Sequence, residues 1–85
     1  MLDREIIETK ERVESLRLRL AESDLDCFLV TNLNNLFYLT GLRSSAGAAL
    51  INQDELLLII DGRYVTLAEE LAMSYWKTGL TVIQV

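Results

Sequence analysis

Two short stretches, NLFYLTG at residues 35–41 and DGRY at residues 61–64, mark the fold of this chain most clearly. In the first, Gly41 can end a helix, because glycine adopts the left-handed backbone conformation at little cost. In the second, Asp61 is a residue type that caps the start of a helix. We therefore predict a short helix that ends at the first stretch and a longer helix, over about residues 63–76, that follows Asp61.

The N-terminal residues 3–22 form the longest predicted helix. Apolar residues recur there at spacings of three and four, which draws one stripe along a helix face. The stripe fits either a helix laid on a sheet or a coiled-coil seam, and its short length favours the first. Ser23-Asp24 should end the helix, with Asp24 in a left-handed position. The residues of the stripe are Leu2, Ile6, Thr9, Val13, Leu16 and Leu20.

Further apolar segments are predicted to be strands. Residues 27–30 form a continuous apolar run, which is typical of a strand buried on both faces. Residues 46–51 and 55–60 are joined by the turn-forming residues 52–54 and should pair as an antiparallel hairpin. Residues 80–85 give the last strand. The order α–β–α–β–β–α–β predicts an α/β fold with a mixed sheet and helices on both faces.

The composition limits the possible functions. The length of 85 residues suits one domain, and a net charge of −5 argues against nucleic-acid binding, since no basic patch is available for phosphates. No apolar run could span a membrane and the chain does not open like a signal peptide, so we expect a cytoplasmic protein. Cys27, the single cysteine, is predicted to be a small core residue. The lack of histidine removes the commonest general base and transition-metal ligand.

Four motifs in register give the chain a family resemblance. They are DCFLVT at 26–31, NLFYLTG at 35–41, SAGA at 45–48 and DGRY at 61–64. Together they resemble the N-terminal domain of the creatinase/prolidase metallopeptidase family, above all that of Xaa-Pro aminopeptidases and Xaa-Pro dipeptidases. The resemblance implies a ribonuclease-H-like α/β domain that precedes a pita-bread catalytic domain with two divalent metal ions (Mn, Co or Zn). Residues 1–85 would then be an N-terminal domain that is incomplete at its C-terminal end and has no cofactor of its own.

The resemblance also implies where such a domain meets its neighbours. In the family's dimers, the loop after YLTG lies toward the catalytic cleft of the partner subunit. Arg43 in this loop is either a solvated cation or a contact across the dimer, and Arg63 should form an ion pair or an inter-subunit contact. Serine catalysis is not expected, because no base is near the loop serines in the sequence. The candidate access or dimer-contact residues are Tyr38, Leu42, Arg43, Ser44, Ser45, Arg63 and Tyr64, and the candidate structural residues are Asn35, Gly41, Gly47, Asp61 and Gly62.

These observations lead to a hypothesis about function. The chain would be the non-catalytic N-terminal domain of an Xaa-Pro peptidase, serving homodimerisation and control of access to the active site. Short proline-containing peptides would be substrates of the parent enzyme only, through metal-assisted hydrolysis. An alternative from another class is an interaction or chaperone module from a relative that has lost its metal ligands. A third is an unrelated small α/β domain that works alone.

Overall fold

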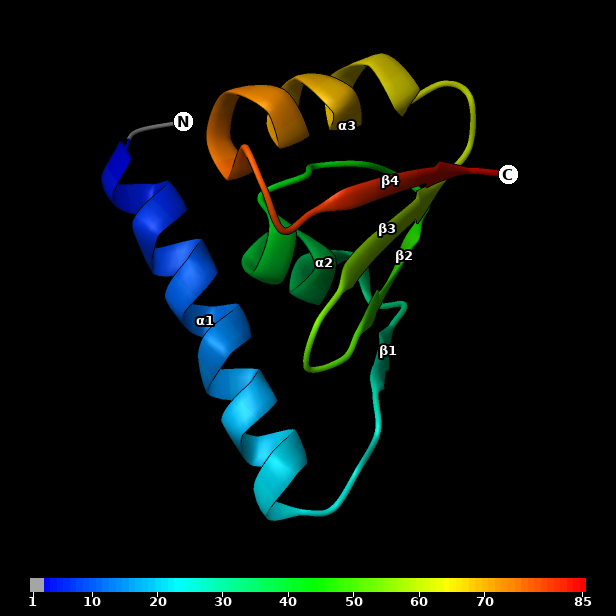
Figure 1. Ribbon diagram of the computed structural model, residues 1–85. Helices are drawn as coiled ribbons and strands as arrows, with labels where there is room; N and C mark the ends of the chain where they lie inside the picture. Colours follow the sequence, from blue (N-terminus) through cyan, green and yellow to red (C-terminus); the bar gives the residue numbers. More distant parts are fainter. Residues whose placement is uncertain (1–2) are drawn as a thin grey trace.

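The computed structural model describes residues 3–85 and contains the predicted order of helices and strands (Figure 1). The elements are α1 (Asp3–Glu22), β1 (Phe28–Val30), α2 (Leu33–Thr40), β2 (Ala48–Ile51), β3 (Leu56–Ile60), α3 (Val65–Leu71), the π-helical turn η1 (Ala72–Trp76) and β4 (Thr81–Gln84). No described helix is both long and apolar enough to cross a membrane.

The strands form one mixed sheet, as the sequence predicts. They lie in the order β1-β2-β3-β4, with antiparallel pairing among the first three and parallel pairing between β3 and β4. The β2–β3 turn is closed by Asn52, whose side-chain Oδ1 accepts hydrogen bonds from the backbone N–H groups of Asp54 (2.9 Å) and Glu55 (2.6 Å). This side-chain-to-backbone bonding explains why the predicted hairpin forms here.

α1 lies on the outside of the molecule and packs on α2 and η1 (Figure 1). In the described part of its apolar stripe, Thr9, Val13 and Leu20 are at most 2% exposed. Leu2 and the side chain of Ile6 lie outside the part of the chain that the structure describes. The helix therefore rests on its own domain, and no coiled-coil partner is needed to bury the stripe. Asp24 then adopts a φ of 57°, which confirms the predicted left-handed position.

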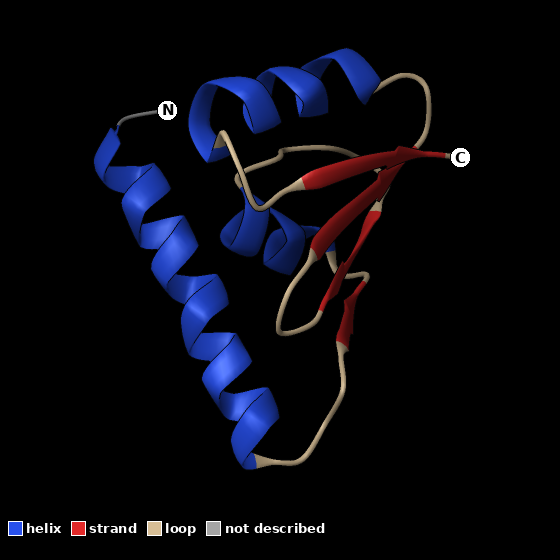
Figure 2. Ribbon diagram, viewed as in Figure 1, coloured by secondary structure: helices blue, strands red, loops and turns tan. Residues whose placement is uncertain are grey.

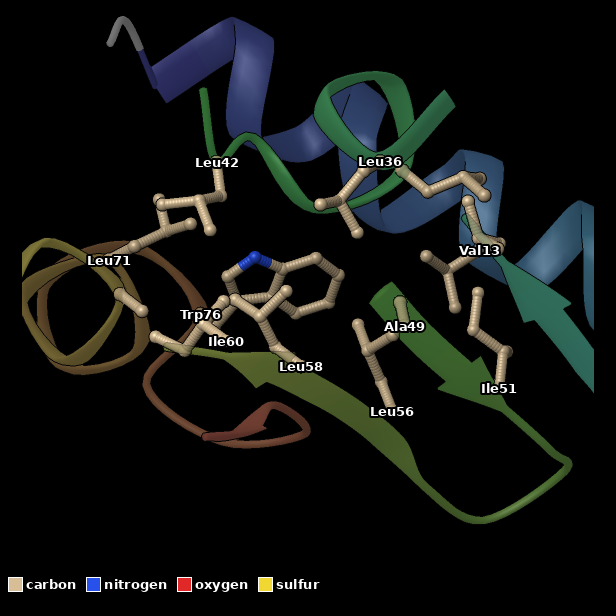
Figure 3. Close-up of a cluster of buried hydrophobic side chains, with 13 residues drawn as sticks. Val13, Leu36, Leu42, Ala49, Ile51, Leu56, Leu58, Ile60, Leu71 and Trp76 are labelled. Carbon is tan, nitrogen blue, oxygen red and sulfur yellow. The ribbon is translucent and has the colours of Figure 1, made fainter. Parts of the chain in front are cut away.

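One face of the sheet carries all the described helices, and we call it the covered face (Figure 2). Its strand residues in the core are at most 2% exposed, and the Trp76 indole lies among them and the helix side chains (Figure 3). The opposite, open face is only half-buried along β2 and β3, so the expected second helical layer is not found in residues 3–85. The core residues of the covered face are Val30, Ala49, Ile51, Leu56, Leu58 and Ile60, and the open face carries Leu29, Ala48, Leu50, Leu57, Ile59, Thr81 and Ile83.

Two predictions about β1 are wrong. This strand was expected to be buried on both faces, but Phe28 and Leu29 are 43% and 58% exposed, and only Val30 is buried. Cys27, expected in the core, is exposed as a free thiol. The reason is that β1 is a short edge strand with a neighbour on one side only. An apolar run does not tell the position of its strand within the sheet.

The helix predicted over residues 63–76 differs from the observed one in its first residue and in its N-cap. α3 begins only at Val65, and Tyr64 holds the N-cap position without a side-chain hydrogen bond. Asp61 does not cap the helix, because its carboxylate instead accepts the backbone N–H of Arg63 (2.9 Å) in a tight turn. Leu67 on α3 is 47% exposed, although it is apolar.

The end of this helical segment widens into η1, which makes a long-range contact with α2. The indole Nε1–H of Trp76 donates a hydrogen bond to the backbone carbonyl of Thr40 at the end of α2 (2.9 Å). Lys77 follows with a φ of 60°, and Gly79 has a φ of 94°. A periodicity argument could not find this π-helical turn, since the partner of Trp76 is 36 residues away.

Candidate functional site

The two diagnostic stretches of the sequence meet in space at the end of the loop formed by residues 42–45. The backbone N–H of Ser45 donates a hydrogen bond to the Tyr64 hydroxyl oxygen (3.2 Å), and the hydroxyl groups of Ser45 and Tyr64 are hydrogen-bonded to each other. The bond from the Ser45 side chain, followed by that from its backbone, holds the pKa of Tyr64 below its usual value. The structure therefore joins the loop to the DGRY turn.

The other end of the loop is held by the core. Leu42 is 2% exposed and packs in the same cluster as Leu36 and Trp76, so the side chain of this candidate contact residue belongs to the core. Thr40 supports it, because its Oγ1 accepts the backbone N–H of Leu42 (3.1 Å) and donates to the carbonyl of Leu36 (2.7 Å). The loop therefore leaves α2 from a fixed starting point.

Arg43 and Ser44 lie between these two fixed ends. Arg43 is exposed, and its guanidinium carbon is 4.2 Å from the centroid of the Phe37 ring. It lines a groove of about 420 Å³ together with Leu67, Glu70 and Tyr75. The Ser44 hydroxyl oxygen is buried and has no hydrogen-bond partner in the described part of the chain. Arg43 is thus an exposed cation held over an aromatic ring, and not a freely moving one.

Arg63 forms an ion pair, which is one of the two alternatives that the sequence leaves open for it. Its guanidinium contacts the Asp61 carboxylate, with 2.8 Å between Nη2 and Oδ2. The hydrogen bonds from the Arg63 side chain and then its backbone lower the pKa of Asp61, and the same pairing raises the pKa of Arg63. Both side chains are well exposed, so the pair orders the turn more than it stabilises the fold.

Tyr38 lies apart from the loop, although it was grouped with it. The Arg12 guanidinium carbon of α1 is 4.0 Å from the Tyr38 ring centroid, and Arg12 also donates a hydrogen bond to the Tyr38 carbonyl (3.1 Å). Tyr38 lines a separate groove of about 590 Å³ between α1 and α2, with Leu16 and Phe28. Tyr38 therefore belongs to the contact of α1 with α2, and the structure does not bring it to residues 42–45.

The candidate structural residues act through the backbone. Asn35 donates its N–H to the Oδ1 of Asn32 (3.1 Å), so Asn32 is the N-cap at the start of α2. Gly41 ends α2 with a φ of 87°. A Cβ on Gly47 would lie 3.3 Å from the Ile59 carbonyl oxygen, so glycine allows the close approach of β3. A Cβ on Gly62 would lie 3.1 Å from the flexible end of the Gln84 side chain only.

The side chains that the structure describes do not gather into a metal centre. The sequence contains no histidine, and nowhere within residues 3–85 do three carboxylate or thiol side chains converge on a possible ion. The two-metal site of creatinase/prolidase enzymes therefore cannot be assembled from the side chains described here. What the site offers is an exposed guanidinium on a loop that is held at both ends.

Comparison with known proteins agrees with this fold. The family model of the creatinase/prolidase N-terminal domain matches residues 12–83. The chain belongs to this family. The creatinase/prolidase N-terminal domain described here is 32% identical, over 76 residues, to the protein named "Probable Xaa-Pro aminopeptidase P" of Phaeosphaeria nodorum. That match covers 89% of this chain and 10% of the relative.

Solved structures give the same assignment. The domain is similar to an Xaa-Pro aminopeptidase from Streptococcus pyogenes, with a TM-score of 0.80 and 33% identity over 92% of this chain and 57% of that chain. It is also similar to the N-terminal domain of the cytoplasmic peptidase PepQ from Mycobacterium tuberculosis, with a TM-score of 0.70 and 32% identity over 86% and 55% of the two chains. This creatinase/prolidase N-terminal domain thus spans about a tenth of its curated relatives and just over half of these solved chains.

Proposed function

We propose that this chain is the non-catalytic N-terminal domain of a cytoplasmic Xaa-Pro aminopeptidase- or dipeptidase-like metallopeptidase. In this proposal residues 1–85 are part of a longer N-terminal domain, and a separate catalytic domain of the parent holds two divalent metal ions (Mn, Co or Zn). Membership of the family supports the proposal, as do relatives named for Xaa-Pro peptidase activity and the small share of their length that is matched.

The proposed role of the domain is to support homodimerisation and to limit access to the active site of the partner subunit. The observation that carries this proposal is the loop of residues 42–45, which is held by the core at Leu42 and by Tyr64 at Ser45. Arg43 projects between these two points with an exposed guanidinium. A guanidinium in a fixed place suits the carboxylate or a carbonyl of a short proline-containing peptide.

The first experiment separates the domain from the parent. The purified 85-residue chain, supplied with Mn²⁺ or Co²⁺, should not cleave an Xaa-Pro peptide, and metal-dependent cleavage would contradict the proposal. Sequencing the gene beyond the codon for Val85 then tests the parent. A reading frame that carries two aspartates, a histidine and two glutamates as metal ligands supports the peptidase, and a frame without them favours the interaction or chaperone module.

The second experiment tests the loop in the parent enzyme. Replacing Arg43 by alanine should raise KM for a short Xaa-Pro peptide by about tenfold and leave kcat nearly unchanged, because a binding contact is lost. Arg19→Ala is the matched control, since it removes the same charge from an exposed position on α1. Equal kinetic effects of the two variants would contradict the access role of residues 42–45.

A further inference from the structure

Leu67 is a large apolar side chain that is 47% exposed, although its helix α3 packs on the core. It lines a groove of about 420 Å³ between α3 and the loop that follows α2, which passes below α3 in Figure 1. Leu71 and Tyr75 line the same groove and pack on the core, so the groove has an apolar floor. Its volume lies in the range of grooves that hold small ligands.

The walls of this groove carry one charge of each sign. Arg43 stands on the loop and Glu70 on α3, and both side chains are exposed. Neither of them forms an ion pair within residues 3–85. The guanidinium carbon of Arg43 lies over the Phe37 ring, 4.2 Å from its centroid, and a guanidinium stacked in this way can still donate hydrogen bonds from its edge. The groove therefore offers a cation and a carboxylate to one ligand.

This arrangement selects a short zwitterion. An anion without a positive charge would be repelled by Glu70, and a cation without a negative charge would be repelled by Arg43. The groove follows the helical segment from Leu67 to Ser74, which is about 10 Å long at the rise of an α-helix. An extended peptide of two or three residues has a length of about 7–10 Å, whereas a single amino acid would leave much of the groove unfilled.

We propose that this groove binds a di- or tripeptide that has both ends free and an apolar first side chain. The carboxylate of the peptide accepts hydrogen bonds from Arg43, and its ammonium group donates to the carboxylate of Glu70. Leu67 precedes Glu70 by three residues and therefore lies on the same side of α3. The apolar side chain that packs on Leu67 is thus that of the residue with the free ammonium group.

The inference rests on the proposed access role of residues 42–45, because Arg43 is common to both. It goes further in two respects. It adds Glu70 and Leu67 of α3 to the residues that contact the peptide. It also names the peptides that the domain prefers, since only a peptide of two or three residues presents both of its free ends to one groove of this length.

Nuclear magnetic resonance titration of the 85-residue chain with the dipeptide Leu-Pro tests the proposal. Three further probes each lack one feature. Leu-Pro amide lacks the carboxylate, N-acetyl-Leu-Pro lacks the ammonium group, and Gly-Pro lacks the apolar side chain. Leu-Pro should shift the amide signals of the groove residues with a dissociation constant on the order of 1 mM. Each of the other probes should bind at least about fivefold more weakly.

Three variants identify the side chain that recognises each feature. Arg43→Gln should remove the preference for Leu-Pro over its amide, and Glu70→Gln should remove the preference over N-acetyl-Leu-Pro. Leu67→Ala should reduce the preference over Gly-Pro. All three side chains are exposed, so the changes should leave folding intact. Glu69→Gln is the matched control, because Glu69 is also exposed on α3 but does not line the groove.

Equal weakening by Glu69→Gln and Glu70→Gln would overturn the proposal, and so would equal binding of the four probes. Shifts confined to residues outside the groove, or no shifts well above the expected dissociation constant, would overturn it too. The amide spectra of the variants confirm that they are folded. Failure here is distinct from failure of the proposed function. If Arg43→Ala raises KM in the parent enzyme and Glu70→Gln does not, the access role stands and only this inference is wrong.

Discussion

The covered and open faces of the sheet have almost the same composition but very different surroundings. Leu58 and Leu57 are neighbours in β3, yet Leu58 is fully buried and Leu57 only half-buried. The difference comes from the helices, which place Val13, Leu36 and Trp76 on one side of the sheet only. An apolar residue type in a strand therefore indicates only that the position can be buried. The packing of the helices decides whether the position is buried.

The difference between the two faces is tested most directly by replacing each of the two neighbouring leucines with alanine. Leu58→Ala should lower the free energy of unfolding by about 3 kcal/mol, because it leaves a cavity among close-packed side chains. Leu57→Ala should cost less than about 1 kcal/mol, since this side chain already contacts water. Urea unfolding of both variants at low protein concentration measures the difference. Similar losses would mean that the open face is covered in solution.

Trp76 tests how the helical layer is fastened to the covered face. Trp76→Phe keeps an aromatic ring in the core but leaves the Thr40 carbonyl without its indole donor. We expect a loss of about 1–3 kcal/mol in the free energy of unfolding, which is the usual cost of an unpaired buried group. Far-UV circular dichroism should follow the transition, because Trp76 is the only tryptophan and its fluorescence disappears in the variant. An unchanged stability would show that the hydrogen bond does not hold η1 in place.

The smallest expected effect concerns the turn that leads from β3 to the helices over the covered face. Hydrogen bonds from Arg63 lower the pKa of Asp61 in the folded state, so the carboxylate contributes stability above its unfolded pKa of about 4. This contribution should be lost as the pH falls through the lower folded pKa. The difference in unfolding free energy between wild type and Asp61→Asn should therefore shrink at acidic pH. A difference that stays constant with pH would contradict the role of this ion pair.

Much of the fold can be predicted where the deciding contacts are local. Asn32 caps α2 through residues two and three positions away, and Asn52 closes the hairpin over the same distance. The element order, the mixed sheet and the family follow from such local signals and from the four motifs. The predictions for β1 and Cys27 failed, because the position of a strand in the sheet depends on pairing with distant segments.

The candidate site was predicted in part. An ion pair was one of two alternatives predicted for Arg63, but its partner Asp61 was expected to cap the helix instead. Tyr38, by contrast, was grouped with the loop because it is near in the sequence. In the structure its ring contacts the Arg12 side chain of α1 and lines a different groove. The bond between Ser45 and Tyr64 was not predicted, because hydroxyl groups 19 residues apart carry no pattern in the sequence.

The sequence by itself determined the caps of α2, the hairpin, the order of the elements and the creatinase/prolidase family of this chain. Those features depend on hydrogen bonds and turn preferences within a few residues, which the chain makes wherever it folds. Only the tertiary structure decided that one face of the sheet is covered, that Leu42 is buried and that Ser45 meets Tyr64. These features depend on the burial of apolar area among segments far apart in the chain, and each segment can satisfy that requirement in more than one way.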